Sequence, residues 1–538
     1  MLRNYLEKIT CYYLSGNRWW MPLAAGCLYS FALPPLNHET HWSLSLFPLL
    51  CFVILLPLTA FAIQPSLKRA VIHSYLYGFT AAFGQYHWLI FDKAEGLWHF
   101  VIMGLFLTSA IVGLLYLAAG LLFRIAAGAV GLFPKAYVLI FPALWVVIDY
   151  CRTLGDLAFP WAFLGYALTP ILPLAQLASV TGVWGLTFII VLGNMLVWEL
   201  LRKSFLGAVY KKQLRLIMIF TAGLLVVSVS GWLRMHHSAR GGNQGPLKIS
   251  LLQPNIDQLH WSNDMLDMAF TVSESLMVKA SMEKPDLMIL PESALLCYIT
   301  HRQTYKERLA AVIRRVRIPL IFGSLDWERS TSGSSYDAYV YNTAFYIDTG
   351  TLEIKPYHKM KLVPFSEAIP FEGLFPLLSR VNLGEADFHR GTEKTVFYIG
   401  AEVKAAPFIC YESIFPDFVR QRVLRGVNLL VNITNDGWFG RSSGPYHHAM
   451  MARMRSIENG VSLARCANSG ISMFVDPVGK INGHTKLYQK SILTRSVPLY
   501  TLPTPYTRFG DWFVGACGIM IGLAVLAAAL KRRERNVT

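Results

Sequence analysis

Long apolar segments dominate the first 240 residues, and they constrain the fold more than any other feature of the chain. Seven of them are long and apolar enough to cross, or nearly cross, a hydrocarbon core of about 30 Å as helices. An eighth lies just before a basic C-terminal tail. We expect membrane-spanning helices near residues 19–36, 43–63, 70–91, 97–123, 136–151, 180–200, 214–232 and 511–530.

The composition divides the chain into two unlike parts. Apolar residues make up 54% of the chain and charged residues 15%, whereas soluble domains average about 45–50% and about 25%. Residues 1–240 contain 16 Lys or Arg and 7 Asp or Glu, while the remaining 298 residues contain 33 and 26. We therefore expect a transmembrane helical bundle over residues 1–240, an extracytoplasmic domain over 241–505, and a final transmembrane helix with a basic cytoplasmic tail over 506–538.

The basic residues indicate how the chain is oriented. The formal net charge is +16, but the Lys and Arg residues flank the apolar segments and form no continuous stripe, which argues against nucleic acid as a partner. If the N-terminus is cytoplasmic, 16 basic residues fall in the cytoplasmic termini and loops, whereas the first, third and fifth loops on the other side contain only two, Lys93 and Arg152. Because cytoplasmic loops are enriched in Lys and Arg, we expect both termini inside and the polar domain outside.

Eight cysteines are present, and only Cys297, Cys410 and Cys466 lie in the polar domain. No CxxC pair and no metal-ligand spacing occurs, so we expect neither a metal site nor a disulfide framework, and no cofactor. An odd number of thiols leaves at least one of the three unpaired within this domain.

The polar domain has the pattern of an α/β fold. Short apolar runs that end at Pro, Asn or Glu alternate with longer amphipathic stretches, which is typical of strands alternating with helices. We expect strands near 247–253, 286–290, 319–323, 341–347, 406–410 and 427–433, helices near 262–283, 301–317 and 446–458, and a hairpin near 461–475.

Reactive side chains follow three of these strands. Glu292 stands in Pro-Glu-Ser, Lys359 in a polar stretch after the strand that ends near Asp348, and Cys410 in Ile-Cys-Tyr-Glu. A thiol, a carboxylate and an amine are the groups that nucleophilic acyl transfer requires. Each also has a structural interpretation, since a Cys after an apolar run is often a core residue and Lys359 and Lys361 fit a solvated face. The residues alone leave both interpretations open.

The order Glu292, Lys359, Cys410 resembles the nitrilase/amidase superfamily. The motifs that carry the resemblance are Pro-Glu-Ser, Tyr-x-Lys-x-x-Leu-Val-Pro-Phe and Ile-Cys-Tyr-Glu. The resemblance implies a Glu-Lys-Cys triad on an α-β-β-α sandwich, with Cys410 as the nucleophile, Glu292 as the general base and Lys359 as the group that stabilises the oxyanion.

Three further segments resemble the bacterial apolipoprotein N-acyltransferase family, namely Leu362–Glu367, Thr434–Gly440 and Met451–Gly460. The resemblance to this family covers essentially the whole chain. The implied fold is a multi-pass α-helical membrane bundle fused to an α/β nitrilase-like sandwich domain. One departure is Ser366, where the family commonly has Gly, and we expect only a slight change in loop conformation. The resemblance also implies supporting or substrate-binding roles for Trp261, Glu367, Tyr411, Glu412, Trp438 and Phe439.

The implied reaction moves a fatty acyl chain from a membrane phospholipid, through a Cys thioester, to the α-amine of the lipidated N-terminal cysteine of an apolipoprotein. This is the last step of lipoprotein maturation, at the periplasmic side of the bacterial inner membrane, with a diacylglyceryl-modified apolipoprotein as acceptor. Each buried CH₂ contributes ~0.8 kcal/mol, so moving a 16-carbon chain into water costs on the order of 12 kcal/mol. A membrane bundle next to the thiol avoids that cost.

Two alternatives remain at the level of sequence. A membrane-tethered nitrilase-like amidase would share the triad but use water as the acceptor, and seven helices exceed what a tether needs. A transporter or receptor would use the outer domain only to bind ligand, but the apolar segments contain no chain of ionisable groups. His447 and His448 are adjacent, so they face different directions on a helix and we expect neither to be catalytic.

Overall fold

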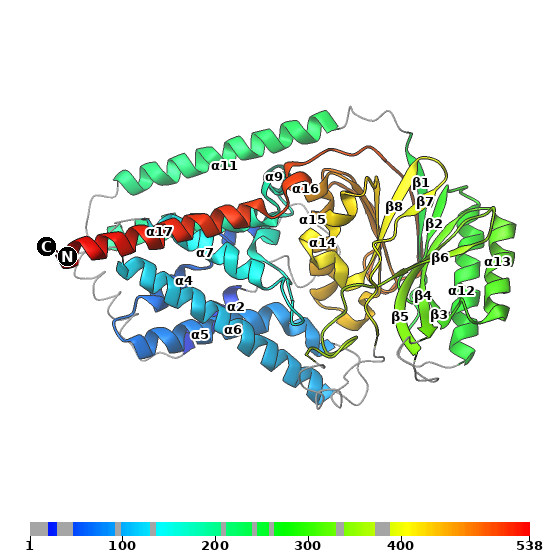
Figure 1. Ribbon diagram of the computed structural model, residues 1–538, viewed down its shortest axis with the longest axis horizontal. Helices are drawn as coiled ribbons and strands as arrows, with labels where there is room; N and C mark the ends of the chain where they lie inside the picture. Colours follow the sequence, from blue (N-terminus) through cyan, green and yellow to red (C-terminus); the bar gives the residue numbers. More distant parts are fainter. Residues whose placement is uncertain are drawn as a thin grey trace.

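The computed structural model describes residues 20–29, 47–91, 98–129, 136–205, 211–238, 245–257, 263–329, 338–371 and 388–537. Helices from the first half of the chain form one end of the molecule, and two β-sheets with their flanking helices form the other (Figure 1). The helical end comprises α2 (Trp20–Tyr29), α3 (Phe47–Leu50), α4 (Leu56–Ala62), α5 (Leu67–Tyr86), η2 (His87–Phe91), α6 (Trp98–Ala129), α7 (Tyr137–Cys151), η3 (Leu164–Leu168), α8 (Leu172–Ala175), α9 (Ala178–Thr181), α10 (Val183–Phe205) and α11 (Lys211–Ser238), joined by α17 (Trp512–Val537).

Each of the eight apolar segments expected to span a membrane contains a helix. Among the described residues, four helices are long and apolar enough to cross a membrane, namely α6, α10, α11 and α17. The helix α7 is shorter, at 15 residues. The apolar helices confirm a membrane-type helical region, and the number of crossings stays a prediction.

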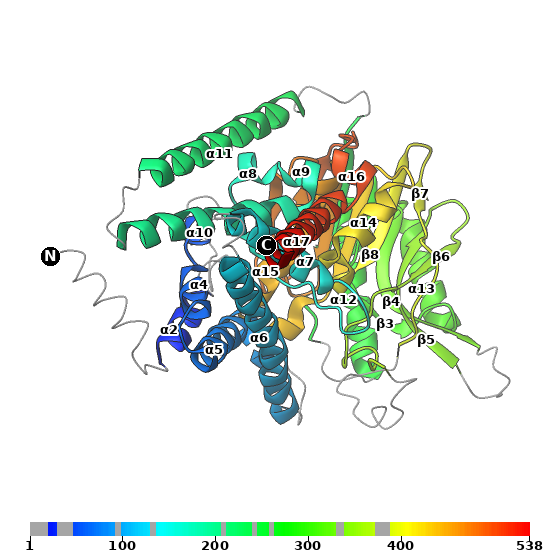
Figure 2. The same cartoon turned by 60° about the vertical axis from the view of Figure 1, so that its left-hand side comes forward.

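The outer helices of this region expose apolar side chains. In the most apolar 18-residue stretch of α11 only 6% of residues are buried, and in that of α17 only 11%. In the corresponding stretch of α10, 61% of residues are buried inside the bundle. Both views show α11 at the edge of the bundle and α17 beside α7 (Figures 1 and 2). Helices with apolar exposed faces are typical of contact with lipid.

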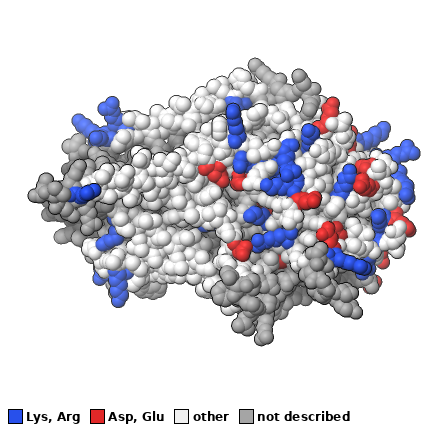
Figure 3. All heavy atoms as spheres, viewed as in Figure 1, with Lys and Arg blue, Asp and Glu red and all other residues white. Residues whose placement is uncertain are grey.

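Charged side chains are distributed in the same two-part way. On the face seen in Figure 3 they gather over the sheet end of the molecule, and the helical end is uncharged except near its far tip. Lys211 and Arg533 belong to helix ends at that tip. An uncharged belt between two charged zones is the surface expected of a membrane-embedded bundle.

Local sequence sets the ends of the elements in the sandwich. The strand β1 (Leu247–Gln253) ends where Pro254 removes a backbone donor. The helix α15 (Gly444–Asn459) has Pro445 in its first turn and ends at Gly460, whose φ of 64° is the left-handed conformation of a helix C-cap. The strands and helices predicted from the apolar runs of the polar domain are present.

Two sheets form the centre of the sandwich. In the described residues the first has seven strands in the order β13-β1-β2-β4-β5-β6, with β3 paired to β4, and the second has six in the order β12-β11-β10-β9-β8-β7. The remaining bounds are β2 (Leu287–Ile289), β3 (Leu295–Tyr298), β4 (Leu320–Arg329), β5 (Ala338–Ile347), β6 (Ile354–His358), β7 (Phe397–Ile399), β8 (Val403–Ile409), β9 (Leu429–Thr434), β10 (Ser462–Ala467), β11 (Met473–Val475), β12 (Ile481–His484) and β13 (Ser491–Val497).

Helices cover both outer faces of the paired sheets. A buried core joins the sheets, with Ile249 and Ile321 from the first and Val431 from the second. The helices α12 (Asn263–Ser281) and α13 (Gln303–Val316) cover the first sheet, and α14 (Pro416–Val423) and α15 lie on the second sheet's side, towards the bundle (Figure 1). This is the α-β-β-α arrangement expected from the sequence.

The helix α15 is the main link between the sandwich and the bundle. The Glu458 carboxylate accepts a hydrogen bond from the Val183 backbone N–H at the start of α10, at 3.0 Å. Arg455 donates to the Tyr166 hydroxyl at 2.8 Å. A second link is formed by α16 (Pro505–Phe509) and the start of α17, where Asp511 accepts from the Trp184 indole at 2.6 Å. Buried polar contacts of this kind fix the orientation of two packed surfaces.

Candidate active site

The three predicted catalytic residues follow three strands that end at one edge of the sandwich. Glu292 follows β2, Lys359 follows β6 and Cys410 follows β8. The register of β2, β4, β5 and β6 makes β2 and β6 parallel, so Glu292 and Lys359 share an edge of the first sheet. Gly323 permits this arrangement, because a Cβ there would lie 2.6 Å from the Glu292 Cα.

Glu292 and Lys359 form a buried ion pair. The Lys359 Nζ lies 3.1 Å from Glu292 Oε1 and 2.7 Å from Glu367 Oε1, and its side chain is 1% exposed. Burial alone would lower the pKa of Lys359, but the two carboxylates outweigh burial and raise that pKa well above its ordinary value. Lys359 is therefore a permanent cation at the site.

Glu292 is held in place by three donors. Its Oε1 accepts from the Asn342 amide at 2.8 Å as well as from Lys359, and its Oε2 accepts from the Asn435 backbone N–H at 2.8 Å. Asn342 also donates to Glu367 at 3.2 Å. Asn342 is not predicted from the sequence, where its only signal is an amide inside a largely buried strand.

Cys410 has a left-handed backbone conformation at the start of the turn that follows β8. Its φ is +46°, in the left-handed region that non-glycine residues seldom adopt, and its side chain is half-buried. Burial raises the pKa of the Cys410 thiol strongly, Glu292 raises it further, and Lys359 opposes both. The thiol is thus protonated at neutral pH, and a nearby base is needed to form the thiolate.

The three groups therefore interact electrostatically within one site. The charge of Cys410 acts on Lys359, and the charges of Glu292 and Lys359 act on Cys410. Lys361, by contrast, is exposed, and its Nζ lies over the Phe415 ring at 5.2 Å. The structure thus brings Glu292, Lys359 and Cys410 together and leaves Lys361 outside.

Two predicted supporting carboxylates connect loops of the site. Glu367 Oε2 accepts from the Val363 backbone N–H at 2.9 Å, so it holds its own loop closed under Lys359. Glu412 is fully buried and accepts from the Ile409 backbone N–H at 2.7 Å and from the Met360 backbone N–H at 2.6 Å. Ser366 is exposed and has no left-handed φ, so this position does not require glycine.

The predicted aromatic residues lie towards the bundle. The Tyr411 hydroxyl donates to the Ala158 carbonyl, and the ring stacks on Phe159 with a centroid separation of 6.2 Å. Phe439, in η6 (Asp436–Phe439), packs against bundle aromatics. Its ring centroid lies 4.7 Å from that of Trp88 and 5.6 Å from that of Trp161.

Trp438 and Trp261 are the other two predicted aromatics. Trp438 is half-buried in η6. Trp261 lies outside the residues that the structure describes. Trp88 and Trp161 are not predicted from the sequence, because apolar segments contain many aromatic residues and spacing does not single out two of them.

A buried polar network lies behind Cys410. His448 is placed 2.8 Å from Asp436 Oδ1, 2.8 Å from Ser413 Oγ and 3.1 Å from the Cys410 carbonyl oxygen. Burial lowers the pKa of His448, and so does Arg465, which donates to Asp436 at 2.7 Å. Of these contacts, the one with Cys410 is to its main-chain carbonyl oxygen, and the absence of a catalytic role for His448 stays a prediction.

The other two sandwich cysteines are buried and free. Cys466 donates to the Ile289 carbonyl at 3.2 Å, and Cys297 belongs to the core beside α12 and α13. Cys410 is thus the most exposed of the three sandwich thiols. Burial raises the pKa of Cys297 to about 11, which makes that thiol inert at neutral pH.

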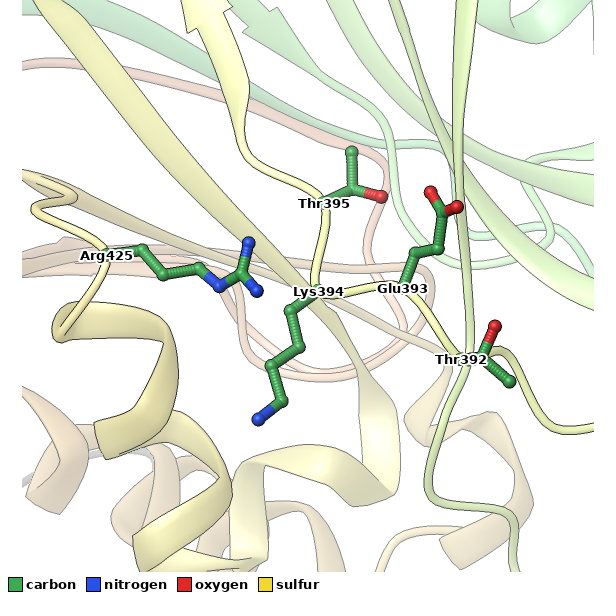
Figure 4. A pocket seen from close by; sticks show the side chains of 5 residues that line it. All are labelled: Thr392, Glu393, Lys394, Thr395 and Arg425. Atoms are coloured by element: carbon green, nitrogen blue, oxygen red, sulfur yellow. The ribbon is translucent and has the colours of Figure 1, made fainter.

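A surface cavity of about 410 Å³ is formed by residues outside the site. Its lining residues, from the loop before β7 and the end of α14, are Thr392, Glu393, Lys394, Thr395 and Arg425 (Figure 4). The Arg425 side chain extends towards the backbone near Lys394, while the Lys394 side chain points in another direction (Figure 4) and its Nζ donates to Gln421 Oε1. None of Glu292, Lys359 and Cys410 lines this cavity.

The sandwich and the apolar helices define a class of protein, a nitrilase-fold domain joined to a membrane bundle. The carbon-nitrogen hydrolase family matches residues 248–502, and the apolipoprotein N-acyltransferase N-terminal domain matches residues 25–196. A solved amidase from Nesterenkonia sp. is similar over 51% of this chain and 96% of its own, with 18% identity and a TM-score of 0.37.

Curated relatives identify the family. An apolipoprotein N-acyltransferase of Geobacter metallireducens is 36% identical over 73% of this chain and 74% of its own, and one of Chlorobaculum tepidum is 32% identical over 74% and 78%. One of Haemophilus influenzae is 28% identical over 96% and 95%. The chain belongs to the apolipoprotein N-acyltransferase family.

Proposed function

We propose that this chain transfers a fatty acyl group from a membrane phospholipid to the free α-amine of the lipidated N-terminal cysteine of an apolipoprotein, through a thioester on Cys410. One observation carries the proposal. A thiol in a left-handed turn is coupled electrostatically to a carboxylate and a buried ammonium, beside aromatic residues that continue into an apolar bundle. The names of the relatives supply the acceptor.

In the first half-reaction, the Glu292 carboxylate takes the Cys410 proton as the sulfur attacks the ester carbonyl of the phospholipid. The new C–S bond leaves a tetrahedral oxyanion, and the Lys359 ammonium stabilises it. Collapse breaks the C–O bond, and the proton on Glu292 passes to the departing lysophospholipid oxygen. The thioester and a lysophospholipid are the products.

In the second half-reaction, the amine of the acceptor attacks the thioester carbonyl. Glu292 now takes a proton from the attacking nitrogen, and the Cys410 sulfur leaves and is reprotonated. The reaction is therefore ping-pong, with the first product released before the acceptor binds. Because two carboxylates keep Lys359 charged, its ammonium is available to stabilise the oxyanion in both steps.

The aromatic cluster formed by Trp88, Trp161, Phe439 and Phe159 provides an apolar route for the acyl chain. It extends from η2 and the loop after α7 to Tyr411, the residue next to the nucleophile. With ~0.8 kcal/mol per CH₂, a continuous apolar path removes a cost on the order of 12 kcal/mol for a 16-carbon chain.

The proposed location is the bacterial inner membrane, with the sandwich on the periplasmic side and both termini in the cytoplasm. The support is the distribution of charge. The basic ends of α11 and α17 lie at the tip of the bundle farthest from the sandwich, as cytoplasmic anchors would (Figures 1 and 3).

The experiment is to incubate the purified protein with phospholipid and no acceptor, and to measure its intact mass. We expect an acyl adduct that hydroxylamine removes, on wild type and on Cys151→Ala, which removes an exposed thiol at the end of α7. Cys410→Ala should give none. A wild type that stays unmodified, or an adduct that persists on Cys410→Ala, would contradict the proposal.

A further inference from the structure

Arg422 is a fully buried cation that the triad does not use. It lies on α14, directly after the nucleophile turn, and is 0% exposed. Its guanidinium lies between the rings of Tyr357 and Phe418, at 4.5 and 4.8 Å from their centroids. Within the described part of the chain, its Nε and Nη1 have no hydrogen-bond partner. A buried charge of this kind needs an anion nearby to offset its desolvation.

The Tyr357 hydroxyl links this cation to a buried anion. Arg422 Nη2 donates to the Tyr357 oxygen at 2.6 Å, and the hydroxyl in turn lies 2.7 and 2.8 Å from the two oxygens of Glu412. Tyr357 and Arg422 are both fully buried. The three side chains thus form one charge-compensated chain, in which the hydroxyl donates to the carboxylate and accepts from the guanidinium.

Glu412 joins the two loops that carry the nucleophile and the lysine. Its Oε2 accepts from the Ile409 N–H at 2.7 Å, and its Oε1 accepts from the N–H groups of Met360 and Lys361 at 2.6 and 3.2 Å. Ile409 precedes the nucleophile, and Met360 follows Lys359. A carboxylate accepts these three bonds fully only when it is ionised, because protonation removes one oxygen as an acceptor.

Ionisation of Glu412 is sensitive to its surroundings. Burial raises the pKa of Glu412, and Arg422 is the largest opposing influence. From the other elements around this turn, Tyr357 on β6 contacts the carboxylate, and His448 on α15 contacts Ser413 and the Cys410 carbonyl. Lys359 is occupied by Glu292 and Glu367.

The exposed Lys361 Nζ lies over the Phe415 ring and so does not face the carboxylate.

We propose that Arg422 and Tyr357 are positioning residues for the acylation step. They act through Glu412 by keeping its carboxylate ionised, and this carboxylate holds the Cys410 turn against the Lys359 loop. The inference rests on the proposed function, since its effect is measured on thioester formation.

The test is the rate of thioester formation from phospholipid as a function of pH. In Arg422→Gln, the pKa of Glu412 rises further, so the carboxyl is neutral at neutral pH and the two loops lose a shared acceptor. We expect the acid limb of the rate profile to move up by about one pH unit or more, because an opposite charge at this range shifts a carboxyl by about 1–3 units. The rate at pH 7 falls about tenfold and recovers at alkaline pH.

Three further variants complete the test. Arg422→Lys restores the cation and should return the acid limb towards that of wild type. Tyr357→Phe removes the link and should shift the limb in the same direction as Arg422→Gln. Arg425→Gln, an exposed position three residues along the chain, should leave the profile unchanged.

A merely structural role would lower the rate by the same factor at every pH and leave the acid limb in place, which would overturn the inference. If Arg422→Gln does not fold, Tyr357→Phe decides by the same criterion. Failure of the proposed function is distinguishable, since wild type itself would then form no thioester. If wild type forms the thioester and the variants keep the acid limb of the wild-type pH profile, only the positioning role is refuted.

Discussion

Lys359 and Lys361 are separated by one residue, yet their environments are opposite. Lys359 is 1% exposed and paired with two carboxylates, whereas Lys361 is exposed above an aromatic ring. The strand β6 ends at His358, so both lysines lie after it and the alternation of strand faces, which would place residues two apart on one side, does not apply to them. Charge type alone would not distinguish these two residues.

Replacing each lysine by methionine separates the two environments. Lys359→Met removes the cation proposed to stabilise the oxyanion, which is also the largest influence that lowers the pKa of Cys410, so we expect thioester formation to fall about 10²–10³-fold. Lys361→Met should stay within about twofold of wild type. The rate of acylation from phospholipid is the measurement, and equal losses in the two variants would refute the role given to Lys359.

The sequence predicts the residues that stand in motifs and misses those placed by long-range contacts. Glu292, Lys359 and Cys410 follow strands and are recognisable from the segments around them. Asn342 and the Asn435 N–H, which hold Glu292, are 50 and 143 residues away along the chain. Nothing local in the sequence indicates that these groups meet Glu292, because only the folded sheets bring them within hydrogen-bond distance.

At the level of elements, the site depends on how closely β4 approaches the turn after β2. Gly323 on β4 has an ordinary φ, but a Cβ there would lie 2.6 Å from both the Glu292 Cα and the Pro291 carbonyl oxygen. The glycine is thus required by space and not by backbone conformation. Main-chain atoms cannot move aside as a flexible side chain would, so any added atom displaces the Glu292 turn.

Gly323→Ala should therefore impair catalysis more than it affects folding. We expect acylation to fall about tenfold to a hundredfold, since displacements near 1 Å in a catalytic group have effects of this size. Gly245→Ala is the matched control, because a Cβ there meets nothing within 4 Å. Acylation rates and thermal unfolding are measured together, and a Gly323→Ala protein with the rate of wild type would contradict this account of the turn.

The elements of the sandwich are predictable from the sequence more closely than those of the bundle. Runs such as 247–253 and 286–290 have a strand's length and end at Pro or Asn, and the strands found there match them. In the bundle, apolarity is continuous, so it indicates where helices lie but not where they end. The helix α6 accordingly extends to Ala129, beyond the expected limit near residue 123.

At the scale of the whole molecule, the bundle and the sandwich are parts of one site. The helix α15 is hydrogen-bonded to the bundle through Glu458, and the nucleophile's neighbour Tyr411 is bonded to Ala158 in the loop after α7. The aromatic cluster crosses the same boundary. Under the proposed function, this continuity gives a lipid acyl group an apolar route to the Cys410 thiol.

The acceptor distinguishes an acyltransferase from an amidase, and one measurement addresses it directly. Protein acylated on Cys410 is freed of phospholipid and mixed with a diacylglyceryl-modified lipopeptide, and the masses of protein and peptide are followed in time. We predict that the adduct leaves the protein as the peptide gains one acyl group on its α-amine, in equal amounts, and that an N-acetylated peptide gains none. Release of free fatty acid at the same rate with and without lipopeptide would contradict the account.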